Sequence, residues 1–241
     1  MIFLFREFNQ EIDSVNLTGS KMKILVTGGG SEEPIDNVRA VCNFSTGRTS
    51  AFLSDLFCEK GNEVTEIVSE KGVKPVKANF ITYKTFSQLA DILQKECESK
   101  KYDAVVHAAA VSDYSPYCIV VDGKEYPVGS FSKVPAGTEL TIKMKKNPKL
   151  VDSIKKWSGT KTSVIAFKLT SNADEDERKT AVNKIFSSNE DKSFVPDFVV
   201  SNDLSEITNE KHPCVIYSNI MEAVARVDTL SELGNKLLEL V

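Results

Sequence analysis

A short apolar run that ends in three consecutive glycines constrains the fold of this chain most. Ile24–Val26 is followed by Thr27 and the glycines 28–30. This pattern is typical of a buried parallel strand that opens into a loop where a ligand can approach the backbone. A dinucleotide-binding turn would need its third glycine where Glu33 stands. Glu32 and Glu33 would also put negative charge where a pyrophosphate sits, so the loop looks like a nucleotide-fold entrance adapted to another purpose.

Strands and helices alternate along the rest of the chain. The sequence predicts strands at 23–27, 63–69, 80–82, 103–108, 163–168, 198–201 and 213–217, and helices at 49–60, 86–100, 148–157, 175–186 and 229–240. This alternation favours an α/β fold, a doubly wound Rossmann-like parallel sheet covered by helices on both faces.

Two segments interrupt this alternation. Residues 114–146 contain several Gly and Pro residues, so we expect a long loop with short strands. The last of these strands, 139–144, alternates apolar and polar residues and should be half exposed. The polar segment 187–193 is interpreted as a surface insertion. We expect residues 1–21 to form an N-terminal tail and 22–241 to form one domain.

Bulk composition excludes several classes of function. The formal net charge of -4 gives no general affinity for nucleic acid, and the apolar runs are too short to span a bilayer. The apolar start, 1–5, lacks the cleavage site of a signal peptide. Five cysteines without a C-x-x-C pair indicate reduced thiols in a cytoplasm, and two histidines argue against a Cys/His metal cluster. Cys42 is expected to be a buried thiol rather than a nucleophile.

A second motif leads into the first predicted helix. In Asn43-Phe-Ser-Thr-Gly-Arg48, the residues Ser45, Thr46 and Gly47 would present backbone N–H groups and hydroxyls, which together form a common anion site. They could also be an ordinary Ser/Thr N-cap. The functional interpretation gains weight because this motif and the glycine loop would both open at the carboxyl edge of one parallel sheet, where ligands bind in such folds.

The strand predicted at 103–108 ends at the same edge and continues as Ala-Ala-Ala-Val-Ser-Asp-Tyr114. Three alanines leave room for a flat ring or a ribose against the main chain, and Asp113 offers a carboxylate to hydroxyls or to a metal-bound phosphate. His107, among apolar neighbours, is interpreted as a buried, hydrogen-bonded histidine rather than a base. Lys133 and the lysines beyond it make the following region basic.

Together these segments resemble the phosphopantothenoylcysteine synthetase family, the ligases of coenzyme A biosynthesis. The resemblance covers about residues 22–241 and rests on five segments in order: Thr27–Arg39, Asn43–Gly47, Ala108–Tyr114, Ala166–Leu169 and Val200–Asp203. It implies a Rossmann-like fold with a small β arm for dimerisation, and a stand-alone synthetase without the flavin-dependent decarboxylase to which many bacterial members are fused.

The resemblance also implies a reaction and a set of site residues. The reaction would condense 4′-phosphopantothenate with L-cysteine through an acyl-nucleotide, using CTP or ATP with Mg²⁺. Asn43 and Lys133 would be catalytic: Asn43 would hold the acyl-nucleotide for attack by cysteine, and Lys133 would neutralise phosphate while that intermediate forms. The nucleotide would be bound by Gly28, Gly29, Ser45, Gly47, Ala109, Asp113, Phe167 and Lys184. The organic substrate would be bound by Asn43, Ser45 and Arg48.

Two other function classes remain open at this point. An NAD(P)-dependent short-chain-type oxidoreductase would need a Tyr-x-x-x-Lys pair, and none of the six tyrosines has a lysine four residues later. A non-catalytic nucleotide-binding module would not explain Asn43 and Lys133 together. The stretch Phe167–Leu169 favours ATP, whereas the size of the chain favours CTP. We expect a cytoplasmic homodimer that binds small molecules, and neither nucleic acid nor membrane.

Overall fold

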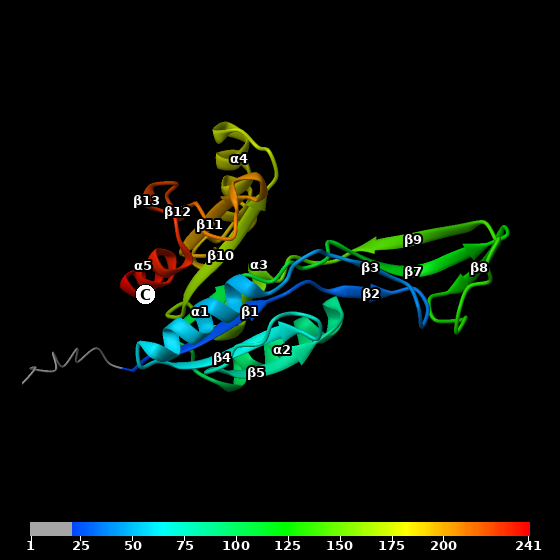
Figure 1. The fold of residues 1–241 in the computed structure, drawn as a ribbon, viewed down its shortest axis with the longest axis horizontal. Helices are drawn as coiled ribbons and strands as arrows, with labels where there is room; N and C mark the ends of the chain where they lie inside the picture. Colours follow the sequence, from blue (N-terminus) through cyan, green and yellow to red (C-terminus); the bar gives the residue numbers. More distant parts are fainter. Residues whose placement is uncertain (1–20) are drawn as a thin grey trace, which may run out of the picture.

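The computed structural model describes residues 21–241, so the expected N-terminal tail lies almost entirely outside the described residues. An eight-stranded sheet forms the body of the protein (Figure 1). In spatial order its strands are β13 (Ala223–Val227), β12 (Cys214–Ser218), β11 (Phe198–Asp203), β10 (Ser163–Thr170), β6 (Ala104–His107), β1 (Lys23–Gly28), β4 (Glu63–Ser69) and β5 (Asn79–Tyr83). The six strands from β11 to β5 run parallel, and β12 and β13 continue one edge antiparallel.

Helices cover both faces of this sheet. They are α1 (Arg48–Glu59), α2 (Phe86–Ser99), α3 (Val151–Ser158), α4 (Glu175–Phe186) and α5 (Leu230–Leu240). Alternate strand residues point to opposite faces, so Val26 joins the core under α1 and α5 while its neighbour Leu25 joins the core under α2 and α3. The helix α4 packs on the same face as α2 and α3, over Ala166 and Val199.

The predicted alternation is therefore confirmed, and every predicted strand and helix of the body occurs within three residues of its expected bounds. The mostly parallel sheet is confirmed as well. Two features differ from the expectation: the strand predicted at 213–217 is antiparallel, and β13 was not predicted. The sequence of β13 is short and only partly buried, so it lacks the apolar run that marks the central strands.

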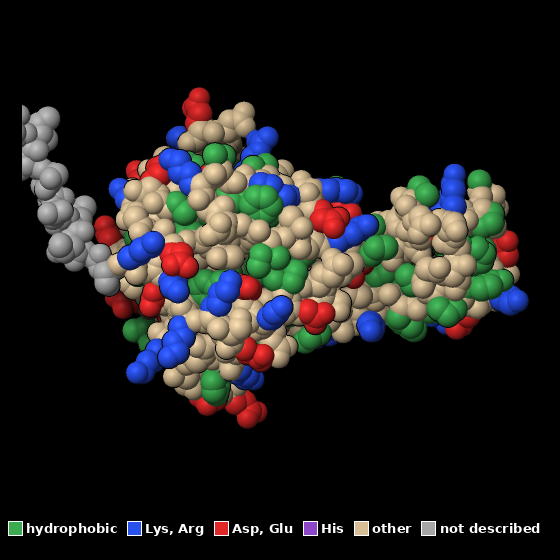
Figure 2. Space-filling model, turned by 90° about the horizontal axis from the view of Figure 1, so that it is seen from below, with side chains coloured by type: hydrophobic (Ala, Val, Ile, Leu, Met, Phe, Trp, Pro, Cys, Tyr) green, Lys and Arg blue, Asp and Glu red, His purple; other side chains and the backbone are tan. Residues whose placement is uncertain are grey.

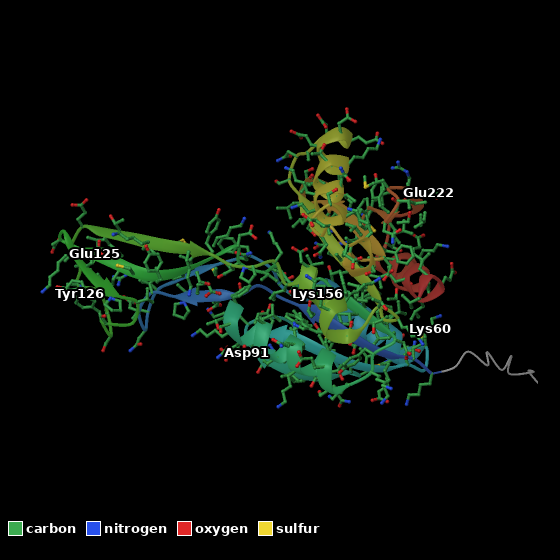
Figure 3. The ribbon with its side chains drawn as sticks, turned by 180° about the vertical axis from the view of Figure 1, so that it is seen from behind. Lys60, Asp91, Glu125, Tyr126, Lys156 and Glu222 are labelled. Carbon is green, nitrogen blue, oxygen red and sulfur yellow. The ribbon has the colours of Figure 1, made fainter. Side chains whose placement is uncertain are left out.

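A separate arm extends from the body (Figure 1). It combines the ribbon of β2 (Glu32–Pro34) and β3 (Ala40–Cys42) with a three-stranded sheet of β7 (Tyr114–Val121), β8 (Lys124–Pro127) and β9 (Leu140–Lys146). A small core of Ile35, Ile119, Val121 and Val134 joins the two parts. Figure 3 shows Glu125 and Tyr126 at the far end of the arm, away from Asp91 and Lys156 on the body.

The arm corrects the expectation of a long loop with short strands at 114–146, because β7 spans eight residues and β9 seven. Proline inside β7 misled the prediction. Pro116 lies where the register between β7 and β9 shifts, and a bulge of this kind accommodates a residue without an N–H group. The half-exposed character expected for the strand beginning near Leu140 is confirmed by its mixed burial.

Both parts of the arm start at the carboxyl edge of the main sheet. The ribbon β2–β3 follows β1, and the sheet β7–β9 follows β6. Since β1 and β6 are adjacent and the chain turns outward from them in opposite directions, the arm begins at the topological switch point of the sheet. This is the edge where the sequence predicts the site.

Candidate active site at the carboxyl edge of the sheet

Backbone hydrogen bonds join the glycine loop to the segment after β6. Ala110 N–H donates to Gly29 O at 2.8 Å, and Ser31 N–H donates to Ala110 O at 3.2 Å. Gly30 and Ala110 thus form a parallel bridge beyond the ends of their strands. The structure therefore brings two of the predicted motifs together and holds them by main-chain contacts.

The glycines of these motifs are required by close approach and by backbone conformation. A Cβ at Gly28 would overlap the side chain of Ser50 on α1, and a Cβ at Gly30 would overlap the carbonyl oxygen of Asn43. Gly29 and Gly47 have φ of 76° and 71°, a region that glycine adopts without strain. The loop, the Asn43 segment and the start of α1 consequently form one tightly packed rim.

The helix α1 begins at a glycine, which has no side chain to cap it. Gly47 is the N-cap residue, so neither Ser45 nor Thr46 holds the N-cap position itself. The Thr46 hydroxyl still accepts a long hydrogen bond from the N–H of Arg48, at 3.4 Å, so the predicted Ser/Thr contribution to this helix start is present in part. The first turn leaves backbone N–H groups directed at the rim, and these together with the positive end of the helix dipole favour an anion. Ser45 is partly exposed beside them, and Arg48 is exposed.

Asn43 lies between the glycine loop and α1. Its backbone N–H donates to Ser31 O at 3.2 Å, which fixes the main chain. Its side-chain amide forms no hydrogen bond with any residue in the described part of the chain and is only partly buried. The amide is thus positioned by its backbone and open to a ligand. The neighbouring Phe44 is 97% exposed.

His107 is confirmed as a buried structural histidine. Its Nδ1 lies 2.8 Å from Oγ1 of Thr27, and burial lowers the pKa of the imidazole to about 4. The same Thr27 hydroxyl accepts a hydrogen bond from Ala109 N–H at 3.3 Å. A neutral histidine therefore helps to fix the ends of β1 and β6 and is not placed to act as a base at neutral pH.

Glu33 does not face a phosphate position. Its Oε1 accepts from the N–H of Phe86, at the start of α2, at 2.7 Å, and its Oε2 accepts from Ser115 Oγ at 3.0 Å. A carboxylate at a helix N-terminus is stabilised by the free N–H groups and by the helix dipole. Glu32 forms an ion pair with Lys71 at 2.7 Å. The two acidic residues that argued against a dinucleotide turn are thus used in building the base of the arm.

Ala109 and Asp113 lie in the segment between β6 and β7, and Phe167 lies in the second half of β10. Ala109 and Phe167 are partly buried, whereas Asp113 is exposed and forms an ion pair with Lys149. Since β6 and β10 are adjacent, the segment after β6 and the second half of β10 lie at the same side of the sheet. Beneath them, Asn147 Nδ2 donates to Ser112 O at 3.0 Å and to Ser115 Oγ at 2.8 Å.

Lys133 lies on the arm, in a loop that is held by a buried carboxylate. Asp36 accepts hydrogen bonds from the N–H groups of Val134, Val38 and Arg39, at 2.9, 2.8 and 2.7 Å, and from Arg39 Nη1 at 2.6 Å. These donors, the Val134 N–H first among them, hold the pKa of Asp36 well below its usual range, although burial acts in the opposite direction. The residue next to Lys133 is therefore fixed to the β2–β3 ribbon.

The ribbon separates Lys133 from the rest of the rim within one chain. From Ala40, beside the ribbon turn, to Asn43 the backbone advances roughly 10 Å at about 3.3 Å per residue. A joint role of Lys133 and Asn43 therefore stays a prediction.

Lys184 lies on α4, and its expected role in binding the nucleotide stays a prediction. It is exposed in the last turn of α4, whereas the first turn of α4 is the end that follows the carboxyl edge of β10. At about 1.5 Å per residue the helix carries Lys184 roughly 14 Å away from that edge. The surface segment 187–193, which is largely exposed as expected, offered no signal of this offset.

Cys42 also differs from the expectation. Its thiol is exposed, because β3 belongs to a two-stranded ribbon that stands clear of the main sheet and has no second layer over this side chain. The sequence also gave no sign of the hydrogen-bonded junctions around Asp36 and Glu33, since their partners lie about 50 to 100 residues further along the chain. The mixture of acidic and polar residues inside the segment 31–39 was the available signal.

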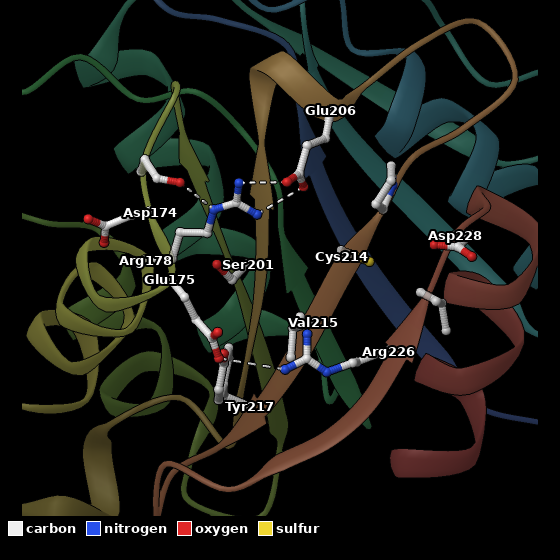
Figure 4. Close-up of a pocket in the computed structure, with 13 residues that line it drawn as sticks. Asp174, Glu175, Arg178, Ser201, Glu206, Cys214, Val215, Tyr217, Arg226 and Asp228 are labelled. Carbon is white, nitrogen blue, oxygen red and sulfur yellow. Dashed lines mark hydrogen bonds and ion pairs between the residues drawn. The ribbon is translucent and has the colours of Figure 1, made fainter.

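A separate cavity of about 420 Å³ lies on the antiparallel flank of the sheet (Figure 4). None of the predicted site residues lines it. Its two arginines already have acidic partners, because Arg178 contacts Glu206 at 2.7 and 2.9 Å and Arg226 lies 3.9 Å from Glu175. Both arginines of this cavity are therefore paired within the protein, and the chemistry of the predicted motifs lies elsewhere.

Other surface features do not define a second site. On the face shown in Figure 2, positive and negative side chains are interspersed over the body. Within residues 21–241, no group of three or more His, Cys, Asp and Glu side chains is arranged to hold a metal ion. No helix in this range is both long and apolar enough to cross a membrane.

The fold and this edge define a Rossmann-like α/β protein whose glycine loop, Asn43 segment and first helix meet at one rim. A family model described as DNA/pantothenate metabolism flavoprotein C-terminal domain matches residues 19–239, so the chain belongs to that family. Curated relatives include the coenzyme A biosynthesis bifunctional proteins CoaBC of Thermococcus kodakarensis, 28% identical over 89% of this chain, and of Methanocaldococcus jannaschii, 29% identical over 79%. The chain spans 49% and 43% of the length of these relatives.

Solved structures agree with this assignment. The DNA/pantothenate metabolism flavoprotein from Streptococcus pneumoniae has a TM-score of 0.78 and 26% identity, over 90% of this chain and 97% of that chain. A Cab2 mutant in complex with phosphopantothenate-cysteine has the same fold, with a TM-score of 0.68 and 16% identity, over 90% of this chain and 88% of that one.

Proposed function

We propose that this protein is a phosphopantothenate–cysteine ligase, which condenses 4′-phosphopantothenate with L-cysteine through an acyl-nucleotide. The observation that carries the proposal is the rim at the switch point, where main-chain hydrogen bonds unite the glycine loop, the Asn43 segment and the segment after β6. Membership of the family and the similarity to coenzyme A biosynthesis proteins support it. The oxidoreductase alternative has no support from these relatives.

The first step of the reaction activates the acid. A carboxylate oxygen of phosphopantothenate forms a bond to the α-phosphorus of a nucleoside triphosphate, and the bond from that phosphorus to the bridging oxygen breaks, releasing pyrophosphate. Several negative charges then share one site, so electrostatic stabilisation is the main requirement. The first turn of α1, which has glycine at its N-cap, and the glycine loop supply N–H donors, and Ser45 adds a hydroxyl.

The second step forms the amide. The cysteine amine attacks the acyl carbon, the bond to the phosphate oxygen breaks, the nucleoside monophosphate leaves and the amine loses its proton. Asn43 would hold the acyl-nucleotide during this attack, since its amide can both donate and accept. The backbone contact of Asn43 to Ser31 fixes the position from which it acts.

Lys133 would neutralise phosphate charge during the first step. Because the β2–β3 ribbon separates its loop from Asn43, this role requires that the arm close over the rim or that the arm of a second subunit reach it. The exposed apolar side chains of the arm, Val38, Tyr114, Tyr117 and Met144, support a homodimer in which they are covered.

Magnesium and the identity of the nucleotide belong to the same proposal. Mg²⁺ typically binds through substrate phosphates, waters and one or two carboxylates, so the lack of an all-protein metal cluster among residues 21–241 fits a metal that enters with the triphosphate. Asp113 is the nearby carboxylate that could contact it. The ion would lower the charge repulsion at the phosphates.

The test is product formation by the purified protein. The protein is given 4′-phosphopantothenate, L-cysteine, Mg²⁺ and each of the four nucleoside triphosphates, and pyrophosphate release and the thiol-bearing product are measured. We expect product with CTP or ATP. If no triphosphate yields either product, the proposed function is wrong.

Two variants separate the steps. Asn43→Asp should still release pyrophosphate but accumulate the acyl-nucleotide, whereas Asn79→Asp, on the exposed start of β5, should behave as the unaltered protein. Lys133→Ala should lower pyrophosphate release by about 100-fold. Lys145→Ala, an exposed lysine of the same arm, is its control. Unchanged rates in Lys133→Ala would show that this lysine is misassigned.

A further inference from the structure

A buried glutamate beneath the glycine loop has no role in the reaction described above. Glu66 lies on β4 between buried residues and its side chain is fully enclosed, with 0% of the residue exposed. Neither carboxyl oxygen has a hydrogen-bond partner among the described residues. Buried polar groups are nearly always paired, so a carboxyl group in this state needs an explanation.

The position of this carboxyl group links it to the rim. A Cβ added at Gly28 would lie 2.9 Å from Glu66 Oε1, so the carboxyl group packs directly against the backbone of the glycine loop. Ser50 and Ser54 of α1 lie on its other side. Ser50 Oγ donates to Gly47 O at 2.9 Å, and Ser54 Oγ has no partner in the described part of the chain. Glu66 therefore lies directly behind the two segments that form the proposed anion-binding rim, the glycine loop and the first turns of α1.

Charge at this position is costly, because no cation contacts it. Burial raises the pKa of Glu66 to about 7, although the hydroxyls of Ser50 and Ser54 act in the opposite direction. The ionisable groups that face it are Asp55 of α1, which adds to the rise, and Lys74 of the β4–β5 connection, which opposes it. From β5, Tyr83 faces it as a neutral phenol whose hydroxyl donates to Gly28 O at 3.0 Å.

We propose that Glu66 is a proton-dependent positioning residue of the anion site: its uncharged carboxyl group permits a polyphosphate at the glycine loop, and its carboxylate repels that polyphosphate. This inference rests on the proposed function for the identity of the anion. The repulsion is strong because protein, and not water, separates the carboxylate from the loop. Binding of the triphosphate therefore takes up a proton wherever Glu66 is ionised in the free protein.

The experiment compares binding by the unaltered protein and by Glu66→Gln. The dissociation constants of ATP and CTP at saturating Mg²⁺, and of inorganic tripolyphosphate, are measured by calorimetry at pH 6, 7 and 8. For the unaltered protein we expect Kd to rise up to about tenfold from pH 6 to pH 8, the limit for a group that titrates near 7. In Glu66→Gln this rise in Kd should disappear. Protonation of the ligand itself affects Kd equally in both proteins, so the difference between the two proteins reports Glu66 alone.

A matched control has the same substitution on the same strand. Glu63→Gln removes an exposed carboxylate that lies 3.8 Å from Lys23, and its Kd should depend on pH as in the unaltered protein. A purely structural role of Glu66 would change the melting temperature of Glu66→Gln but leave the pH dependence of Kd unaltered. Circular dichroism at each pH confirms that the folded protein is compared.

The outcomes separate this inference from the proposed function. Equal pH dependence in the unaltered protein and in Glu66→Gln overturns the role of Glu66 and leaves the ligase proposal intact. If no polyphosphate binds to either protein at any pH, the rim is not an anion site and both proposals are wrong. Product formation without any pH effect in Kd likewise rejects only the role of Glu66.

Discussion

The arm and the central sheet each bury one carboxylate, and the two differ in what surrounds them. Asp36 in the arm accepts four hydrogen bonds, three of them from backbone N–H groups. Glu66 in the sheet has none from any described residue. The first pKa is held well below its usual range and the second is raised to about 7 by burial.

This difference shows that burial alone does not decide the charge of a group. In the arm, donors that converge on the ribbon turn stabilise the carboxylate, and its contribution to stability is present above the pKa of an unfolded aspartate and lost in acid. In the sheet, the carboxyl group is stable only while protonated, so its surroundings favour the fold at low pH and oppose it as pH rises. The two regions therefore respond to pH in opposite directions.

The largest expected effect is in the arm. Asp36→Asn keeps the shape of the side chain but removes its charge. One carboxylate oxygen is replaced by an NH₂ group, which faces N–H donors and cannot accept from them. We therefore expect the melting temperature to fall by about 5–10 °C. Pyrophosphate release should fall with it, because the loop of Lys133 loses its attachment to the ribbon. Calorimetry and the release assay measure the two effects.

The control for this variant is Asp122→Asn, at an exposed turn of the same arm. Asp122 accepts one hydrogen bond, from Glu139 N–H at 2.9 Å, and its loss should change the melting temperature by no more than about 2 °C. If the melting temperature falls by a similar amount in both variants, the four hydrogen bonds to Asp36 stabilise the protein no more than the single exposed hydrogen bond to Asp122.

The next effect concerns the pH dependence of stability through Glu66. The pKa of Glu66 in the folded state, about 7, lies above the ordinary value of 4.5, so the folded state binds the proton more tightly. Stability should be full below about pH 4.5, decline as pH rises to 7, and lose about 2–3 kcal/mol between pH 5 and pH 8. Urea unfolding of the unaltered protein and of Glu66→Gln measures this. A decline that persists in Glu66→Gln would assign it to another group.

A smaller effect is expected at the contact between the loop and α1. Gly28→Ala would force a Cβ into Ser50 and toward Glu66, so we expect a loss of about 1–3 kcal/mol in the free energy of unfolding. Combining it with Ser50→Gly should recover part of any shift in ligand affinity, because the overlapping side chain is then absent. If Gly28→Ala is as stable as the unaltered protein, the side chain of Ser50 or the backbone of the loop can move to accommodate the added Cβ.

The smallest effect is expected from the half-exposed pair Asp113–Lys149. The two side chains are 54% and 55% exposed, so removing the pair in Lys149→Met should cost less than about 1 kcal/mol. Chemical unfolding at low and high salt measures it. A larger, salt-insensitive loss would place this pair with the buried carboxylates rather than with ordinary surface pairs.

Local sequence patterns predicted the body of the fold because each element there is coded within a few neighbouring residues. Apolar runs identified β1, β4 and β6, and amphipathic spacing identified α1 and α2. The same patterns failed for β7, whose proline and neighbouring glycines suggested a loop. They also failed for the orientation of β12, because the sequence of a strand does not indicate whether it pairs parallel or antiparallel.

The candidate site was likewise predictable in part from local sequence and in part not. The segments that form the rim were recognisable as short motifs, and their meeting followed from the rule that parallel strands end at one edge. The sequence could not tell how far Lys184 lies from this edge, because its distance along α4, and not its order in the chain, decides which end of the sheet it reaches.

By itself, the sequence determined the alternating α/β architecture, the glycine-rich entrance and the family to which the chain belongs, because these depend on residues close together in the chain. Only the tertiary structure decided which charges are stabilised. Asp36 meets Val134 and Glu33 meets Phe86 across about 98 and 53 positions, and Glu66 is enclosed by elements that offer it no backbone N–H and no cation in contact. The pKa of a carboxyl group depends on the groups that surround it in space, and those surroundings exist only after the chain has folded.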